Sequence, residues 1–208
     1  MLTHIKGALK DYYHTGTPVP SLPAFARMMT QECRAAGSPR RILEVGPGVG
    51  PMTEQIVRTI SDGDVFDIVE INEEFARTIE RKYLEPARRR EPGAIIRMHC
   101  GAIQTVPLEG AYNYIVSSLP LNNFETAVIR EILARMKSLL APGGRLNFFE
   151  YAGIRRLARP FKGRKDRRRL GEIAVLLRDF DRDNHVTKQV YLFNLPPALK
   201  RSLQATTV

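Results

Sequence analysis

The sequence has little cysteine and no long apolar run. Cys33 and Cys100 are its two cysteines, too few for a disulfide framework and without the paired spacing of a zinc site. We therefore expect two small buried thiols in a reducing compartment, and no metal. Because no run of about 18 apolar residues occurs, no membrane-spanning helix is predicted. Met1 to Lys6 lack the apolar segment of a secretory signal, so none is expected.

Positive charge is in excess. The chain has 32 Lys and Arg against 22 Asp and Glu, which gives a formal net charge of +10. Such a chain is attracted to polyanions, either nucleic acid or an anionic membrane surface. Charge alone does not distinguish the two. Nine of the basic residues fall within residues 155–169, where Asp166 is the one acid.

Strand and helix patterns alternate from Arg41 onward. Apolar runs predict strands at 42–45, 65–70, 94–98, 114–117 and 145–150, and periodicity predicts helices at 52–60, 73–84 and 124–140. Pro86 is expected to stop the second of these helices, and residues 142–144 the third. This order predicts an α/β fold, a Rossmann-like and mostly parallel sheet with helices on both faces.

Further segments flank this core. Residues 1–37 contain two helical patterns, the first amphipathic, and we expect them to form a membrane-facing lid. Residues 38–208 would be the main domain, with a basic insert at 155–180. One apolar face within that insert carries Leu170, Ile173, Leu177 and Phe180. A β-like run at 186–193 is expected near the end of the chain.

The segment from Glu44 to Gly50, E-V-G-P-G-V-G, joins the first strand to a helix. Gly46, Gly48 and Gly50 would let the backbone turn tightly and approach a ligand closely. Glu70 ends the second strand 20 residues after Gly50, where an acid can accept hydrogen bonds from a ribose diol. Together these features fit a dinucleotide or S-adenosylmethionine.

The spacing and charge of this loop favour S-adenosylmethionine. A pyrophosphate binder prefers G-x-G-x-x-G, with its phosphates at a helix N-terminus. The Glu44 carboxylate would repel a phosphate but can pair with the ammonium of a methionine group. The pattern resembles motifs I and II of the class I methyltransferases. That resemblance implies that Glu44 and the glycines hold the amino-acid end, that Glu70 holds the ribose, and that S-adenosylhomocysteine is the product. Ile71 and Ser117 are further expected cofactor-binding residues.

The stretch after the third strand departs from that family. Class I methyltransferases usually place an Asp there against the adenine amino group. In His99-Cys100-Gly101-Ala102, Gly101 stands in its place. We therefore expect adenine to be held by backbone groups around Gly101 and Ala102, or by Gln104.

The segment V-S-S-L-P-L-N-N-F at 116–124 follows the fourth strand. With Phe149-Glu150-Tyr151 and the N-L-P-P-A sequence at 194–198, it is similar to the bacterial phospholipid N-methyltransferase family. The resemblance runs from about Thr15 to Ala198. It implies stepwise methylation of phosphatidylethanolamine towards phosphatidylcholine. Ornithine lipid N-methyltransferases look similar, so the head group stays open.

Methyl transfer to an amine needs a neutral acceptor, because an ammonium has no lone pair. A base near neutral pKa, or a water chain, must take the proton. Serine hydroxyls can hydrogen-bond the amine or a phosphate, and aromatic faces suit a methylated head group. The candidate catalytic residues are Tyr13, His14, Ser117, Glu150 and Tyr151.

The basic insert predicts docking on an anionic membrane. Each Lys or Arg near such a surface contributes about 1 kcal/mol, and we single out Arg164, Lys165, Arg167 and Arg168. The protein is then expected in the cytoplasm, peripheral on the inner face of the membrane, with no nucleic acid partner.

Other acceptors remain alternatives. An RNA adenine N6-methyltransferase shares the glycine loop and the charge. Such enzymes, however, have a sequence similar to Asn-Leu-Pro-Tyr at the fourth strand. In this chain Leu121 stands where their aromatic residue would be. A small-molecule or protein methylase is a further alternative. A binding module without catalysis is another.

Overall fold

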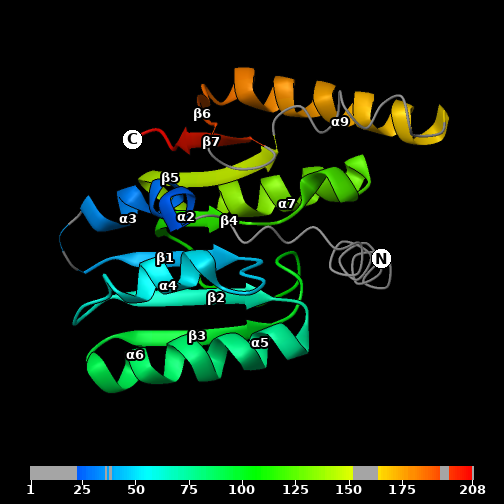
Figure 1. Ribbon diagram of the computed structural model, residues 1–208. Coiled ribbons are helices and arrows are strands. Elements are labelled where there is room, and N and C mark those ends of the chain that lie inside the picture. Colours follow the sequence, from blue (N-terminus) through cyan, green and yellow to red (C-terminus); the bar gives the residue numbers. More distant parts are fainter. Residues whose placement is uncertain (1–22, 36, 38, 152–163, 193–196, 208) are drawn as a thin grey trace.

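A seven-stranded sheet forms the centre of the fold (Figure 1). The computed structural model describes residues 23–35, 37, 39–151, 164–192 and 197–207. The strand order is β3-β2-β1-β4-β5-β7-β6; β1 to β5 pair in parallel, and β7 is antiparallel to both of its neighbours. The strands are β1 Arg41–Val45, β2 Val65–Glu70, β3 Ile95–Cys100, β4 Tyr112–Ser117, β5 Leu140–Tyr151, β6 Thr187–Tyr191 and β7 Ala198–Gln204. The predicted fold class is confirmed.

Helices cover both faces of this sheet. One face packs against α2 Pro23–Met29, α3 Gln31–Ala35, α4 Pro51–Val57, α5 Glu73–Ile79, the π-helix η1 Glu80–Leu84 and α6 Glu85–Arg90. The other face packs against α7 Thr126–Ser138 and α9 Arg164–Asp183. Alternation along each strand creates the two layers: on β1, Ile42 faces the first group, whereas Leu43 and Val45 face the second.

The helices α2 and α3 are anchored in this core. Phe25 packs edge-on against Phe149, with ring centroids 5.0 Å apart. The Lys200 ammonium of β7 donates to the Met28 carbonyl oxygen at 2.9 Å and to the Glu32 carboxylate at 2.8 Å. The second predicted N-terminal helix is therefore part of the packed domain. The first lies outside the described residues, and the lid of residues 1–37 stays a prediction.

The helix α9 presents the predicted apolar face to the core. Leu170, Ile173 and Leu177 are buried, and the Phe180 ring lies edge-on to Phe148 at 5.9 Å. Among the helices of the described ranges, none has the length and apolar character needed to cross a membrane.

The prediction that Pro86 stops a helix is wrong. The chain passes from α5 through the π-helix η1 directly into α6, and Pro86 falls in the first turn of α6. A proline cannot donate the i→i−4 hydrogen bond that a regular α-helix needs at this point, and the π-helical turn directly before it is where the regular hydrogen-bond pattern is already interrupted.

The prediction that residues 142–144 end a helix is also wrong, because α7 ends at Ser138 and these residues lie inside β5. Gly143 adopts a φ of 72° there, and the β4–β5 register shifts beside it, between Tyr112 and Tyr114. A β-bulge of this kind accommodates the extra, turn-like residues without ending the strand.

Cys33 is buried as expected, but the expectation for Cys100 is wrong, because its residue is exposed. Cys100 ends β3, which forms an edge of the sheet. An edge strand has a neighbour on one side only, so less of the chain is available to cover it.

Candidate cofactor site

Three glycines shape the loop between β1 and α4. Gly46, Gly48 and Gly50 have φ values of 70°, 57° and 86°, a region that side chains rarely adopt. A Cβ on Gly46 would lie 2.6 Å from the Leu119 Cδ2 atom. The loop therefore needs glycine for its backbone, and Gly46 also for the close approach of the segment after β4.

The Glu44 carboxylate is completely buried beside this loop. Its Oε2 atom accepts a hydrogen bond of 2.8 Å from the Thr53 hydroxyl, and its Oε1 atom has no partner among the described residues. Burial and, to a smaller extent, the nearby Glu70 carboxyl raise the pKa of Glu44 to about 8, against the opposing effect of the Thr53 hydrogen bond. An orphaned acceptor in this setting suits a cationic ligand and disfavours a phosphate.

The Glu70 carboxylate is held in place by backbone amides. Its Oε2 atom accepts from the Gly48 amide at 3.2 Å, and its Oε1 atom from the Asn72 amide at 2.9 Å. Burial raises the pKa of Glu70, while these hydrogen bonds act to lower it. Asn72 in turn caps α5, because its side chain accepts from the amides of Glu74 and Phe75. A carboxylate fixed in this way is preorganised to accept hydrogen bonds from a diol.

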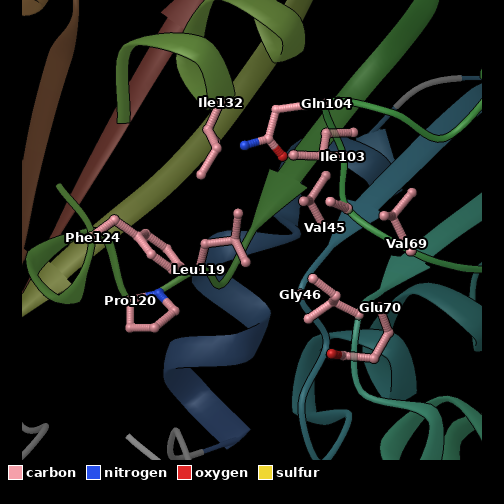
Figure 2. A pocket seen from close by; sticks show the side chains of 13 residues that line it. Val45, Gly46, Val69, Glu70, Ile103, Gln104, Leu119, Pro120, Phe124 and Ile132 are labelled. Carbon is pink, nitrogen blue, oxygen red and sulfur yellow. The ribbon is translucent and has the colours of Figure 1, made fainter. Parts of the chain in front are cut away.

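A pocket opens where the ends of β1, β2, β3 and β4 meet (Figure 2). About 430 Å³ of space free of protein atoms lies within its bounds, and this figure includes open solvent. Five predicted cofactor residues line it, namely Gly46, Glu70, Ile71, Gly101 and Ala102. The other lining residues are Val45, Val69, Ile103, Gln104, Leu119, Pro120, Phe124 and Ile132. The site thus combines a glycine loop, a buried acid pair and a mostly apolar wall.

Comparisons with known proteins agree with this geometry. The family model of a methyltransferase domain matches residues 42–144. A curated relative, an ornithine lipid N-methyltransferase of Singulisphaera acidiphila, is 25% identical over 143 residues, which cover 67% of this chain and 73% of that protein. This chain is a class I S-adenosylmethionine-dependent methyltransferase. Its methyl donor is S-adenosylmethionine, and its product is S-adenosylhomocysteine.

Solved structures share the fold of this methyltransferase. The 1,6-didemethyltoxoflavin-N1-methyltransferase of Burkholderia thailandensis, with S-adenosylhomocysteine bound, has a TM-score of 0.64 and 20% identity, covering 98% of this chain and 88% of that one. The O-methyltransferase of Bacillus cereus, also with S-adenosylhomocysteine, has a TM-score of 0.61 and 16% identity, covering 97% and 90%. One is named for a nitrogen acceptor and the other for oxygen, so the fold leaves the acceptor open.

The residues of the methyltransferase fit this cofactor. The unpartnered Glu44 oxygen would face the ammonium, and the paired Glu70 carboxylate the ribose diol. Glu44 does not line the pocket itself, and Gly48 and Gly50 shape the loop beside it. Three residues at or beside the pocket, Thr53, Ile103 and Ile132, were not predicted from the sequence. A hydroxyl nine residues after Glu44 was the available signal for Thr53, whereas the two isoleucines are indistinguishable from ordinary core residues.

The structure describes the side chains of some predicted catalytic residues but not of others. Ser117 ends β4 and is buried, and its hydroxyl accepts the Leu119 amide at 3.4 Å. Glu150 does not suit the role of general base, because it is buried and ion-paired with Arg201 at 2.6 Å. Tyr13 and His14 lie outside the described residues. Tyr151 ends β5, but the structure does not describe its side chain. The roles of Tyr13, His14, Ser117 and Tyr151 stay predictions.

A second, wider groove lies between α5 and the edge strand β3. Residues that border it include Glu73, Arg77, Met98 and Cys100, and no predicted cofactor residue is among its lining. No group of three or more His, Cys, Asp or Glu side chains suited to a metal occurs in the part of the chain that the structure describes.

Proposed function

We propose that this methyltransferase methylates the primary amine of a membrane lipid head group, with phosphatidylethanolamine as the first candidate and phosphatidylcholine as the end product. The observation that carries the proposal is the position of the basic start of α9. In Figure 1 this start, drawn in yellow, lies on the side towards which the arrowheads of β1, β2 and β3 point. The cofactor pocket opens on the same side. A basic surface on the side where that pocket opens would suit a lipid substrate at an anionic membrane.

The charge order along α9 supports a bound anion. The helix begins with Arg164-Lys165-Asp166-Arg167-Arg168-Arg169, whereas Asp179, Asp181 and Asp183 lie near its end. Cations are unfavourable at a helix N-terminus, where the helix dipole is positive. Lipid phosphates would offset this repulsion.

Two of these basic residues are exposed. Arg167 and Arg168 are exposed, and Arg168 forms a surface ion pair of 2.9 Å with Glu172. Such a pair contributes little in water, so Arg168 is free to exchange its partner for a phosphate. We include Arg164 and Lys165 in the proposed docking surface because they share this first turn of the helix.

The site chemistry is compatible with an amine acceptor. S-adenosylmethionine supplies the methyl group on a cationic sulfur. The protein must keep the amine neutral and exclude water. Leu119, Pro120 and Phe124 give the pocket an apolar wall, and an apolar surrounding disfavours the ammonium form of an amine. We propose Tyr13, His14 or Tyr151 as the group that receives the proton, and Ser117 as a residue that shapes the turn beside it.

An ornithine lipid is the second candidate acceptor. The observation in its favour is the curated relative, which is named as an ornithine lipid N-methyltransferase. Both lipids present a primary amine near an anionic surface. In either case the enzyme would act as a peripheral protein on the cytoplasmic face of the membrane.

The direct test incubates the purified protein with labelled S-adenosylmethionine and vesicles of phosphatidylglycerol. One series adds phosphatidylethanolamine, a second an ornithine lipid, and a third contains ribosomal RNA without vesicles; products are resolved by mass. We expect methylated lipid in one of the first two series. Label in RNA alone would overturn the proposal. No label in any series, together with no rise in melting temperature on adding S-adenosylhomocysteine, would favour a module without catalysis.

A further inference from the structure

Gln104 presents a buried amide to the cofactor pocket. It lies in the turn after β3, which is closed by hydrogen bonds from the amides of Thr105 and Val106 to the Ala102 carbonyl oxygen, at 2.9 and 3.0 Å. Figure 2 shows the Gln104 amide directed into the space that Leu119 and Ile132 border. The amide nitrogen is shielded from solvent and has no hydrogen-bond partner among the described residues.

An unpaired buried amide nitrogen of this kind is uncommon in a native protein. Around it, Ile103, Leu119 and Ile132 line the pocket with carbon atoms. These side chains offer no acceptor, so the missing partner must come from a bound molecule or from water. The pocket is the candidate site for S-adenosylmethionine, so the cofactor is the simplest partner.

The positions of the polar side chains in the pocket indicate which part of the cofactor would contact Gln104. Of the thirteen lining residues, Glu70 and Gln104 are the two with polar side chains. The Glu70 carboxylate can only accept, and its fixed geometry suits the ribose hydroxyls. The base is bonded directly to that ribose, so it must occupy the remaining, mostly apolar part of the pocket. Gln104 is the polar side chain available there.

The chemistry of a carboxamide matches adenine. The 6-amino group of adenine donates hydrogen bonds, and the ring nitrogens beside it accept them. A glutamine side chain accepts through its oxygen and donates through its nitrogen, and can form both bonds at once. Gly101, which directly follows β3, has no side chain to contribute.

We propose that Gln104 reads the adenine base of the cofactor, its amide oxygen accepting from the 6-amino group and its amide nitrogen donating to an adjacent ring nitrogen. Gln104 is then a specificity-determining residue of the cofactor site. The assignment is independent of the lipid acceptor.

The test compares two ligands by calorimetry, S-adenosylhomocysteine and its analogue with unsubstituted purine in place of adenine. Gln104→Met keeps the length of the side chain and removes both polar atoms. Gln189→Met, on the exposed strand β6, is the matched control. The unmodified protein and the control should prefer the adenine ligand by roughly tenfold. In Gln104→Met this preference should fall to about one, through weaker binding of the adenine ligand.

Stability without ligand separates this role from a structural one. Gln104→Met removes a buried donor that lacks a partner, so the ligand-free melting temperature should stay equal or rise. Full retention of the adenine preference in Gln104→Met would overturn the proposal. Equal weakening of both ligands would do so as well, because it would assign Gln104 to the shape of the pocket. A fall in the ligand-free melting temperature would assign it to the fold.

Discussion

The Thr53 hydroxyl on α4 donates a 2.8 Å hydrogen bond to one oxygen of the buried Glu44 carboxylate and leaves the other oxygen unpaired. The bond opposes the effect of burial on the pKa of Glu44. It also turns the free oxygen to a fixed direction. Thr53 is therefore a positioning residue for the group that we expect to meet the cofactor ammonium.

Removal of this hydroxyl should weaken cofactor binding. Thr53→Val keeps the shape of the side chain, so the fold should persist, but S-adenosylhomocysteine should bind roughly tenfold less tightly at pH 7, because a hydrogen bond to a charged group is lost. Thr53→Ser retains the hydroxyl and should bind as the unmodified protein does. Calorimetry measures both constants. Equal binding by the valine variant would exclude the positioning role.

The buried Glu44 also makes the stability of the cofactor-free protein depend on pH. Its pKa of about 8 in the folded state lies above the ordinary carboxyl value of 4.5. Between these values the folded protein keeps a proton that the unfolded chain has lost, so this stabilisation is fully present below pH 4.5 and is lost as the pH rises through 8. Glu44→Gln should therefore raise the cofactor-free melting temperature at pH 8, by an amount that shrinks towards pH 5.

The same residue should link cofactor binding to proton release. A ligand ammonium pairs with the ionised Glu44, so binding of S-adenosylhomocysteine should tighten between pH 6 and pH 8 and release a proton. The binding enthalpy would then change with the ionisation enthalpy of the buffer. Glu44→Gln should lose this dependence and bind roughly tenfold less tightly. A buffer-dependent enthalpy that persists in Glu44→Gln would assign the proton to another group.

Gly46 should tolerate no side chain. In Gly46→Ala the positive φ is strained, and the new methyl group meets Leu119. We expect a loss of about 1–3 kcal/mol in the free energy of unfolding in urea, together with weaker cofactor binding. The double variant Gly46→Ala/Leu119→Ala removes the collision but not the strain. If it is no more stable than the sum of the single changes predicts, the contact with Leu119 is not the cause.

Local patterns were enough to predict most of the sheet and its glycine loop. Apolar runs separated by helical periods define β1 to β5, and the positions of Glu44 and Glu70 follow from the strand ends. The pairing of β7 could not be predicted in the same way. Its Lys200 and Arg201 are buried in the sheet and neutralised by Glu32, Glu150 and Asp181. Charged residues in a central strand conceal the apolar alternation that would identify it.

The sequence also left the adenine end of the site undecided. It named Gln104 as one option beside the backbone of Gly101 and Ala102. What favours Gln104 is the buried position of its unpaired amide nitrogen in a pocket that Ile132 of α7, 28 residues further along the chain, also lines. A contact between segments so far apart leaves no periodic signal in either of them.

Membrane docking should depend on the basic start of α9. Reversing Arg164, Lys165, Arg167 and Arg168 to Glu should abolish sedimentation with vesicles rich in phosphatidylglycerol, because each of these charges contributes about 1 kcal/mol near such a surface. Binding of the unmodified protein should also weaken between 0.05 and 0.5 M salt, as roughly a threefold shorter screening length implies.

The control for this variant reverses four exposed arginines elsewhere, Arg77, Arg81, Arg89 and Arg130. Both variants change the formal net charge from +10 to +2, so any difference between them reports where the charge lies rather than how much there is. S-adenosylhomocysteine should raise the melting temperature of both variants as it does for the unmodified protein. If the α9 variant sediments with vesicles as well as the control does, the docking surface lies elsewhere, whereas equal loss in both would mean that net charge alone drives the attraction.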